Sequence, residues 1–431
     1  MPLTVPRQPA VDLARPPAFA RPGRFLSRVR WQLIVGFLLT VCGPALLRWP
    51  ELGASLAASS VDNTFLLTLA AMLLGYVSVR RLAAFPGLAV IVMVLPAFLA
   101  SYGLLAIVTL VTRTPYSVTQ FLSSFLLSGL FFCIAFAIER RVKRLRLAVV
   151  PQGRALALFG SGRVDWSTVS SPDVLPEAVD GIVADLRAEI GSEWEAFLAR
   201  CVLKGIPVYH AKQVQEALTG RVDIEHLSEN SLGSLNPSSL YARTKRGIDL
   251  LAAILAIPVV LPLIALVALA IKRDSPGPVF YTQLRVGYRG EVFRIWKLRT
   301  MRTDGEGAHF TEGEDARVTR VGRVLRKYRI DELPQILNIL RGEMSWIGPR
   351  PESLPLSQWY EREIGFYAYR HIVRPGITGW AQVHQGYAAR PELVRHKLHY
   401  DFYYIKHFSP WLDLVIAVQT VRTVLTGFGA R

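Results

Sequence analysis

The chain has 431 residues, enough for about three structural units, and 51% of them are hydrophobic while only 19% are charged. With a mean hydropathy of +0.29, this balance excludes an intrinsically disordered chain and is typical of a membrane protein. Lys and Arg outnumber Asp and Glu by 50 to 33, a net charge of +17, so the polar parts should attract phosphates. The 3 cysteines are too few and too scattered for a disulfide framework or a zinc cluster.

The N-terminal part is predicted to be a tail followed by membrane helices. Residues 1–30 are rich in Pro and Arg and lack the apolar core of a secretory signal, which predicts a flexible cytoplasmic tail. Residues 31–144 contain apolar stretches that each approach the roughly 20 residues needed to cross a bilayer. We expect four transmembrane helices here, at Trp31–Leu47, Asn63–Val79, Leu88–Val111 and Phe121–Ile138.

Positive charge falls on every second loop of this predicted bundle. Arg and Lys precede the first stretch, separate the second from the third and follow the fourth, whereas residues 50–62 and 113–120 are poor in them. The positive-inside rule then puts both ends of the bundle in the cytoplasm. Buried helices of a soluble protein are the alternative interpretation.

Residues 145–227 alternate short β-type runs with helical ones, which predicts a small α/β domain. A dinucleotide site would need a G-x-G-x-x-G turn, and Gly160 and Gly162 lack the third glycine. A degenerate, Rossmann-like domain with a scaffolding or regulatory role is therefore favoured over nucleotide binding. We expect strands at Leu145–Val150, Ala155–Phe159, Gly181–Leu186 and Ile206–His210, and helices at Glu193–Lys204 and Lys212–Leu218.

A fifth apolar segment follows a linker predicted at 228–240. This segment, Leu250–Ile271, lies in a helix expected at 248–272 and has cations on both sides, which does not fit a crossing. Pro258 and Pro262 each remove a helix hydrogen bond, and both fall on one face. We expect a re-entrant helix that breaks at these prolines and returns on the cytoplasmic side. A kinked fifth transmembrane helix is the alternative.

Asp331 and Glu332 are adjacent acids at the start of an apolar helical run. Neighbouring helix positions point about 100° apart, so the two acids can do different jobs. Helix capping alone would account for acids there. The surrounding cations instead favour a carboxylate that stays ionised and attacks a dianionic diphosphate. Those cations are Arg320, Arg323, Arg326, Lys327, Arg329, Arg341 and Arg350, and the apolar face is expected to consist of Leu333, Ile336, Leu337 and Leu340.

The last third of the chain carries several motifs in a fixed order. They are SPGPVFYTQLRVGYRG, FRIWKLRTM, DARVTRVGRVLRKYRIDELPQILNILRGEMSWIGPRPE and RPGITGWAQV. These runs closely resemble the bacterial sugar transferase family, the monotopic phosphoglycosyl transferases that move a hexose phosphate from a nucleotide sugar onto polyprenyl phosphate. The resemblance implies a catalytic domain at 241–431. The preceding helices and α/β domain look like the large members that start exopolysaccharide, capsule or O-antigen synthesis.

The resemblance also implies roles for individual residues. Asp331 would be the nucleophile that captures the sugar phosphate from a UDP-sugar and releases UMP, and Glu332 would hold Mg²⁺. Polyprenyl (undecaprenyl) phosphate would then attack the phosphoryl-enzyme in a ping-pong route. The positions that match phosphate-binding residues of the family are Lys297, Arg326, Arg350 and Arg374.

Two departures from the family pattern bear on these roles. Leu261 precedes Pro262 where many relatives have Ser, so the break rests on proline alone. After WAQV the chain continues with His384, Gln385, Gly386 and Tyr387 where many relatives have Asn-Gly-Arg, which leaves the sugar specificity open. The run Trp411–Thr426 fits an interfacial helix or a core helix equally well.

The expected fold is thus a membrane α plus α/β protein: a four-helix transmembrane bundle, a small Rossmann-like α/β domain and an α/β-type catalytic domain with a re-entrant helix. The resemblance implies the bacterial inner membrane, a cytoplasmic catalytic domain, and a UDP-sugar, polyprenyl phosphate and membrane lipids as partners. Whether the chain forms a homodimer is left open. A transporter is disfavoured because the predicted spans contain almost no ionisable residues. A nucleic-acid binder is disfavoured because the basic stretch Arg317–Arg329 lacks an interleaved aromatic platform.

Overall fold

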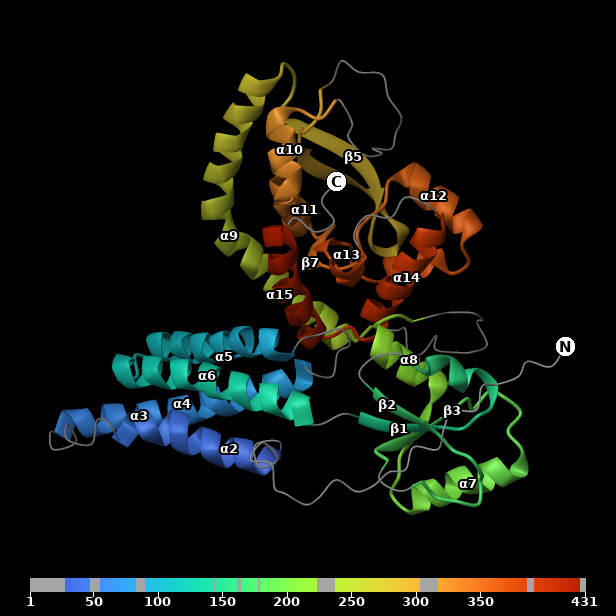
Figure 1. Cartoon of the computed structure of the whole chain (residues 1–431). Coiled ribbons are helices and arrows are strands. Elements are labelled where there is room, and N and C mark those ends of the chain that lie inside the picture. The colour runs from blue at the N-terminus through green and yellow to red at the C-terminus, as the bar shows by residue number, and fades with distance from the viewer. Residues whose placement is uncertain are drawn as a thin grey trace. The chain divides into compact units, whose positions relative to one another are not determined.

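The structure is a computed structural model that describes residues 28–46, 55–82, 90–142, 145–160, 164–176, 179–222, 237–302, 317–385 and 391–426. Most of the predicted tail and linker, together with Gly162, Gly386 and Tyr387, lie outside these ranges. The chain divides into two compact units, 1–73 with 101–144 and 74–100 with 145–431. Figure 1 colours the elements in chain order.

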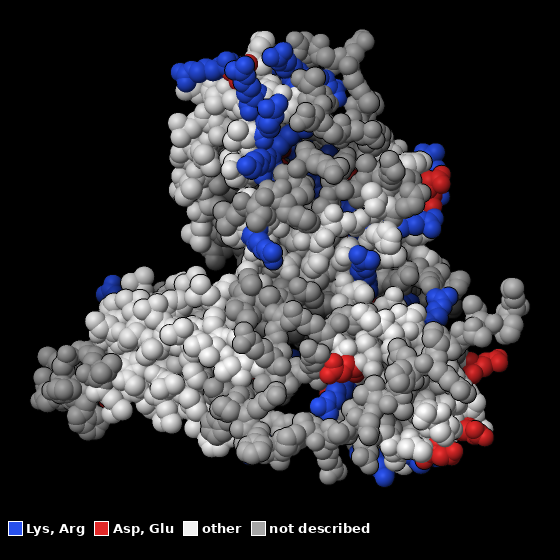
Figure 2. Space-filling view, in the orientation of Figure 1, with Lys and Arg blue, Asp and Glu red and all other residues white. Residues whose placement is uncertain are grey.

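The N-terminal helices have an apolar outer surface. Segments long and apolar enough to cross a membrane are Val29–Leu46, Asp62–Leu82, Met93–Thr112, Val118–Glu139 and, later in the chain, Ser239–Asp274. Leu99, Leu110 and Leu126 are 60%, 78% and 66% exposed, and Figure 2 shows hardly any charged side chain on the described surface of these helices. Such a surface suits lipid rather than water, so this is a membrane-associated protein. The helices are α2 (Val29–Phe37), η1 (Leu38–Cys42), α3 (Gly43–Leu46), α4 (Ser55–Leu82), α5 (Val90–Thr112) and α6 (Val118–Val142).

Polar side chains link helices within the first unit. The Tyr102 hydroxyl on α5 lies 2.8 Å from Ser124 Oγ and 3.0 Å from Ser128 Oγ on α6. Gln32 Nε2 on α2 donates to Glu139 Oε2 on α6 at 2.9 Å. Interhelical hydrogen bonds of this kind hold apolar helices together where the hydrophobic effect between them is weak.

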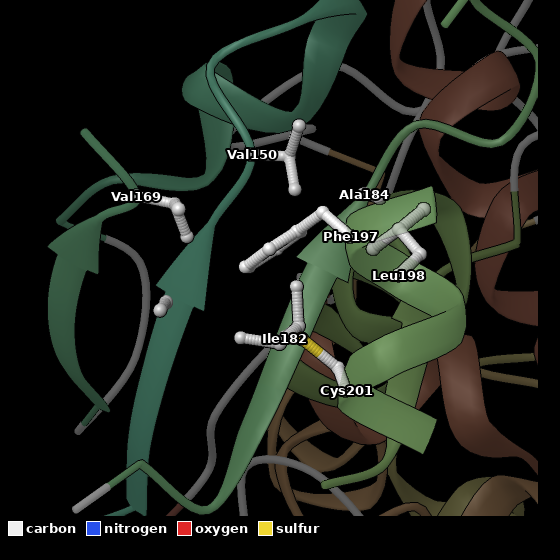
Figure 3. Close-up of a cluster of buried hydrophobic side chains, with 8 residues drawn as sticks. Val150, Val169, Ile182, Ala184, Phe197, Leu198 and Cys201 are labelled. Carbon is white, nitrogen blue, oxygen red and sulfur yellow. The ribbon is translucent and has the colours of Figure 1, made fainter. Parts of the chain in front are cut away.

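The α/β domain is a parallel sheet covered on both faces. Its strands run in the order β2-β1-β3-β4, and every pairing is parallel. One core cluster lies under α7 and includes Phe197 and Cys201, as Figure 3 shows; the other lies under η3 and α8 and includes Leu158 and Val214. The elements are β1 (Leu145–Val149), η3 (Gly153–Leu158), β2 (Val164–Thr168), β3 (Gly181–Ala184), α7 (Ser192–Leu203), β4 (Val208–His210) and α8 (Ala211–Thr219).

The strand predicted at Ala155–Phe159 is wrong, because residues 153–158 form the 3-10 helix η3. Ala155 and Leu158 are its buried residues, and their spacing of three matches the period of a 3-10 helix. The sheet instead takes its edge strand from Val164–Thr168, whose polar, mostly solvent-facing residues gave no strand signal.

The carboxylate of Asp185, which follows β3, contacts the turn after β1. Gly153 has φ +60°, and a Cβ there would lie 2.5 Å from Asp185 Oδ2. The same oxygen accepts a hydrogen bond from Arg154 N at 2.9 Å. In a dinucleotide-binding domain, the N–H groups of this turn face the pyrophosphate. Here one of these groups, Arg154 N, donates to Asp185 instead, and the scaffolding role of the domain stays a prediction.

The C-terminal part, from Ser239 on, is the region in which the family resemblance predicts the catalytic domain, and it is called the catalytic part below. It combines two small sheets with seven α-helices among its described residues. The hairpin β5–β6 is antiparallel, and β7 pairs with β8 in parallel. The elements are α9 (Ser239–Asp274), β5 (Phe280–Val286), η5 (Tyr288–Gly290), β6 (Val292–Leu298), α10 (Arg320–Lys327), η6 (Ile330–Gln335), α11 (Ile336–Arg341), β7 (Ser345–Ile347), α12 (Leu354–Glu363), η7 (Tyr367–Ile372), β8 (Gly376–Thr378), α13 (Trp380–His384), α14 (Pro391–Lys406) and α15 (Pro410–Thr426).

Helix α9 packs along the catalytic core for most of its length. Ala253 and Val260 join a buried cluster with residues of β6 and α11, and Ile271 joins a second cluster with Leu298 and Leu325. Figure 1 shows the curved α9 ribbon beside α10 and α11. The helix is continuous through Pro258 and Pro262, so the described backbone has no interruption at the predicted break.

Both ends of α9 are tied to the same domain. Near its start, Lys245 Nζ lies 2.6 Å from Asp413 Oδ2 on α15. At its end, Asp274 Oδ2 accepts a hydrogen bond from Val321 N at the start of α10, at 3.1 Å. Asp413 also accepts a hydrogen bond from the Tyr404 hydroxyl at 2.9 Å. Because Leu412, Val415 and Ile416 beside it are fully buried, the first half of α15 is a core helix.

The α/β domain contacts the catalytic part through the end of α8. The buried Trp380 indole donates to the Gly220 carbonyl at 2.9 Å. Lys406 Nζ on α14 lies 2.6 Å from Glu216 Oε2 on α8. Both contacts join residues of the second unit.

We predict that Gly322→Ala destabilises the protein by about 2 kcal/mol. A Cβ at Gly322 would lie 2.1 Å from the Thr300 carbonyl oxygen, which is backbone and cannot rotate away. The control is Gly247→Ala on α9, where a Cβ meets nothing within 4 Å and alanine favours the helix by up to about 1 kcal/mol. Thermal unfolding in detergent should rank the variants in this order; equal stability would contradict the close approach of α10 to the end of β6.

Candidate active site

Glu332 is the most tightly held acid of the site. Its Oε1 accepts hydrogen bonds from Lys297 Nζ at 2.9 Å and Arg350 Nη2 at 2.6 Å, and its Oε2 from Arg350 Nη1 at 3.3 Å. Arg329 Nη1 lies 3.9 Å from Oε2. Burial raises the pKa of Glu332, but the charges of Arg350 and Lys297 outweigh it and hold that pKa well below its usual range. Glu332 is therefore an anion at every pH at which the protein works.

Asp331 has a different environment. Its residue surface is only 9% exposed, and it makes no hydrogen bond comparable to those of Glu332 among the contacts described. Burial and the negative charge of Glu332 raise the pKa of Asp331 to about 6, although Lys297, Arg350 and Arg326 lower it. Two adjacent carboxylates with separated pKa values are an arrangement that lets one acid react while the other stays fixed.

The backbone around the acids explains their positions. Asn338 on α11 accepts from Trp296 N and donates to the Arg294 carbonyl, so it fixes α11 against β6, the strand that carries Lys297. Arg329 has φ +54°, a left-handed conformation that bulky residues rarely adopt. Strain of this kind persists where the surrounding structure imposes it and is common at functional sites.

The acids lie on the 3-10 helix η6 rather than at the start of an α-helix. The apolar face predicted for this run is therefore wrong in part. Ile336 is buried as expected, but Leu337 is 40% exposed and Ile339 is fully buried in its place. A 3-10 helix turns by about 120° per residue, so the face shifts where η6 passes into α11. Pro334 inside η6 has no N–H to donate, yet the 3-10 pattern continues past it, because Ile336 N donates to the Leu333 carbonyl where α11 begins.

A buried ionic network holds the backbone of Arg350 in place. Arg370 Nη2 donates to the Arg350 carbonyl at 2.8 Å and lies 2.9 Å from Asp401 Oδ2 on α14. Glu352, two residues after Arg350, accepts from Lys397 on α14. Burial raises the pKa of Glu352, but Lys397 and Arg370 lower it to about 2 overall. This network sets the direction of the turn that presents Arg350 to Glu332.

Three of the four predicted phosphate-binding residues act on the two acids, and the fourth, Arg374, lies elsewhere. Lys297 and Arg350 contact Glu332, and Arg326 contributes its charge to Asp331 while donating to Thr300 Oγ1 at 2.9 Å. Arg374 makes none of these contacts: its Nε donates to the Gly342 carbonyl at 3.0 Å and its guanidinium lies over the Tyr288 ring. Lys and Arg side chains gather around α10 on the surface of the catalytic part (Figure 2).

Sequence reasoning did not assign four groups that shape the site. Arg329 was counted only as part of the cationic approach, and Arg285, whose charge acts on Lys297, gave no signal on a β-type run. Arg370 and Asp401 lie far from the acids in sequence. Their burial, 3% and 2% exposed, is unusual for charged residues, but only the fold reveals it.

A magnesium ion fits this site only together with a substrate. The described residues contain no group of three or more His, Cys, Asp or Glu side chains that could hold a metal by themselves. Glu332 Oε1 accepts hydrogen bonds from two cations, whereas Oε2 has only longer contacts, to Arg350 at 3.3 Å and to Arg329 at 3.9 Å, and keeps a lone pair for a ligand. Mg²⁺ in proteins is usually held by one or two carboxylates plus substrate phosphates. The donor set is compatible with that arrangement.

Comparison with known proteins gives consistent matches. The family model described as bacterial sugar transferase matches residues 240–427. A protein of Aeromonas hydrophila, described as UDP-N-acetylgalactosamine-undecaprenyl-phosphate N-acetylgalactosaminephosphotransferase, is 46% identical over 422 residues, covering 95% of this chain and 99% of that protein. A UDP-glucose:undecaprenyl-phosphate glucose-1-phosphate transferase of Caulobacter vibrioides is 47% identical over 186 residues, covering 42% of this chain and 70% of that protein.

A chain that combines apolar helices with a buried pair of carboxylates in a cationic setting has the features of a membrane-associated enzyme that handles phosphate groups. The near full-length match shows that the chain belongs to the bacterial sugar transferase family. It is an enzyme, a phosphoglycosyl transferase, and the resemblance drawn from its motifs is confirmed.

We predict that Asp401→Asn destabilises the protein by about 3 kcal/mol, because it leaves the buried Arg370 guanidinium without its main counter-charge. The control is Glu361→Gln. Glu361 Oε1 lies 3.8 Å from His371 Nε2, and the Glu361 side chain is 42% exposed. Burial and the charge of Arg370 lower the pKa of His371 to about 3, so that this imidazole is neutral. This contact is not an ion pair at neutral pH, so the change should stay below about 0.5 kcal/mol. Chemical denaturation measures both; a neutral Asp401→Asn would show that the network does not support the site.

Proposed function

We propose that the chain transfers a hexose 1-phosphate from a UDP-sugar to polyprenyl phosphate through a covalent intermediate on Asp331. The observation that carries this proposal is the pairing of two buried acids with different ionisation among four cations, in a chain whose relatives are described as sugar-phosphate transferases. The donors named for those relatives are UDP-N-acetylgalactosamine and UDP-glucose.

In the first step, an Asp331 carboxylate oxygen attacks the phosphorus that carries the sugar. The new Asp–O–P bond forms as the bond from this phosphorus to the bridging oxygen breaks, and UMP leaves with the electron pair. Lys297, Arg350 and Arg326 lie where they can neutralise the diphosphate as the anionic nucleophile approaches. Glu332 keeps Lys297 and Arg350 in position without itself reacting.

In the second step, a phosphate oxygen of polyprenyl phosphate attacks the same phosphorus. The Asp–O–P bond breaks and restores the Asp331 carboxylate, and the product is polyprenyl diphosphate sugar. Asp331 therefore needs to be ionised in the first step and to act as leaving group in the second, and a pKa of about 6 suits both roles.

We propose that Glu332, through its Oε2, would hold Mg²⁺ together with the phosphate groups of the substrate. When bound, the ion supplies charge neutralisation for the transferring group. In the absence of a diphosphate, the cations around Glu332 disfavour a divalent ion at this place.

We also propose that α9, which is continuous but curved (Figure 1), dips into the bacterial inner membrane and keeps both ends on the cytoplasmic side. Two observations support it: Lys245 and Asp274, near opposite ends of α9, both bind elements of the catalytic part, and the helix carries cations at both ends. A helix that crossed the bilayer would separate these contacts by the hydrocarbon core. In this arrangement the chain would perform the first membrane step of exopolysaccharide, capsule or O-antigen synthesis.

We predict that a sugar-phosphate adduct forms on the wild-type enzyme and not on Asp331→Asn, because the amide is not a nucleophile. Full-length protein is mixed with radiolabelled UDP-sugars, UDP-N-acetylgalactosamine first, without acceptor, and protein-bound label is counted. Glu363→Gln, an exposed acid changed in the same way, is the control and should keep the adduct.

The rate of adduct formation should also depend on pH in the direction set by Asp331. A carboxylate is ionised above its pKa, so the single-turnover rate rises about tenfold per unit up to pH about 6 and then levels off. An adduct on Asp331→Asn, or a flat rate between pH 5 and 7, would remove Asp331 from the nucleophile role.

For the topology, we predict that reporters fused at Pro151 and after Arg431 both report the cytoplasm. Pro258→Ala with Pro262→Ala should favour a straight helix, which can cross the bilayer, and should abolish transfer because the catalytic part leaves its position at the interface. Opposite locations of the two wild-type reporters would contradict re-entry, and full activity of the double variant would show that the prolines do not position the site.

A further inference from the structure

A cavity of about 1370 Å³ lies in the catalytic part away from the two acids. It is formed by the first turns of α9, by η5 between the strands of the hairpin, and by the segment around η7 and residue 374. Asp331, Glu332, Lys297 and Arg350 are not among its lining residues. The cavity is therefore distinct from the site of the proposed reaction.

Positive charge in this cavity exceeds negative charge. Four guanidinium groups line it, and of the two lining acids Asp249 lies 3.9 Å from Lys245, while Glu361 faces the neutral His371. Among the described residues, no carboxylate forms an ion pair with any of the four arginines, which are Arg243, Arg246, Arg289 and Arg374. An unbalanced cluster of this kind attracts an anion.

The arginines are held in place by neutral groups. Arg246 donates to the carbonyls of Ile339 and Leu340 at 2.5 and 3.1 Å, and Arg374 Nε to the Gly342 carbonyl at 3.0 Å, so both are fixed at the C-terminal end of α11. These carbonyl contacts orient the guanidinium groups without cancelling their charge, because a carbonyl carries only a partial charge.

The Tyr288 ring contacts two of the guanidinium groups. Arg289 and Arg374 each place Cζ 5.0 Å from the centre of the Tyr288 ring. Arg289 adopts this position with φ +58°, a left-handed conformation that arginine rarely takes. Guanidinium groups oriented in advance bind phosphate with two parallel hydrogen bonds and lose little entropy on binding.

The cavity begins where the apolar face of α9 begins. Arg243 and Arg246 line it from the first turns of the helix, and the next turns expose Leu251, Ile254 and Leu255 at 60%, 56% and 68%. A ligand with a phosphate in the cavity could lay a hydrocarbon chain along this face. Basic pockets at such boundaries are where lipid phosphates bind.

We propose that this cavity binds the phosphate group of a membrane lipid. The inference rests on the proposed function only in placing α9 at a membrane surface. Two lipid sources share this chemistry: an anionic phospholipid, whose phosphate is a diester on acyl chains, and polyprenyl phosphate, a monoester on an isoprenoid chain that would be held beside the reaction site.

The test measures binding to the full chain in neutral detergent and needs no turnover. Four radiolabelled probes are used in equilibrium binding: farnesyl phosphate, dihexanoyl phosphatidylglycerol, dihexanoyl phosphatidylcholine as the zwitterionic control, and inorganic phosphate. Arg243→Gln with Arg289→Gln removes two charges from the cavity. Lys272→Gln with Arg273→Gln removes two exposed charges from the other end of α9 and is the matched control.

We expect the cavity variant to bind farnesyl phosphate or phosphatidylglycerol about tenfold more weakly or with one equivalent less than wild type, and the control variant to bind both as wild type does. The probe that responds identifies the lipid. Tyr288→Leu keeps every charge and removes only the ring, and it should weaken binding of the same probe several-fold. This variant tests the cavity if the double variant does not fold.

Three outcomes would overturn the proposal: unchanged binding in both cavity variants, equal losses in the cavity and control variants, or inorganic phosphate binding as tightly as the lipids. None of these depends on Asp331, so adduct formation can fail while lipid binding is found, or the reverse.

Discussion

The catalytic part is arranged around one buried anion, Glu332. A carboxylate taken out of water is tolerated only when cations and hydrogen bonds surround it, and breaking such a buried pair costs about 3–5 kcal/mol. Each cation comes from a different part of the chain: Lys297 from β6, Arg329 from the turn before η6, and Arg350 from the segment between β7 and α12. The need to satisfy this one charge therefore brings three separate segments together, and in doing so leaves a cationic surface beside Asp331. In the proposed mechanism, folding and catalysis would therefore draw on the same interactions.

A second set of buried ion pairs holds the cations around Glu332 in place. Arg370 bridges the Arg350 carbonyl and Asp401, and Glu352 accepts from Lys397, so α14 is joined to the turn that carries Arg350. The two acids differ as a result. Glu332 has three cations within 4 Å, which hold its pKa low, whereas burial and the charge of Glu332 raise the pKa of Asp331. Sequence neighbours thus acquire separate roles through their environments rather than through their chemical type.

The sequence predicted the parts of this protein that depend on local patterns. The apolar helices, the parallel strands β1, β3 and β4, the helices α7 and α8, and the position of the acids beside Lys297 and Arg350 followed from periodicity and motif. It failed where a local pattern was ambiguous, as in η3, whose short apolar run satisfies a 3-10 helix as well as a strand. It gave no signal where the partner is remote: Arg370 and Asp401 become a pair only in the folded chain, and the contact of Arg374 with the Gly342 carbonyl is likewise visible only in the structure. Long-range charge pairing has no sequence period, so no local pattern could have found it.

The contact between α8 and α13 bears on how this enzyme can be divided. The family model matches only residues 240–427, and the Caulobacter protein matches 186 residues of this chain, which indicates a portable module beginning near residue 240. In this chain, however, the Trp380 indole is 1% exposed and its N–H donates to the Gly220 carbonyl, while Lys406 pairs with Glu216. A module cut in the linker would keep a buried donor with no acceptor, at a cost of about 1–3 kcal/mol. The border of the family model near residue 240 is therefore not a physical border in this molecule, because residues 145–222 belong to the same compact unit as the catalytic part.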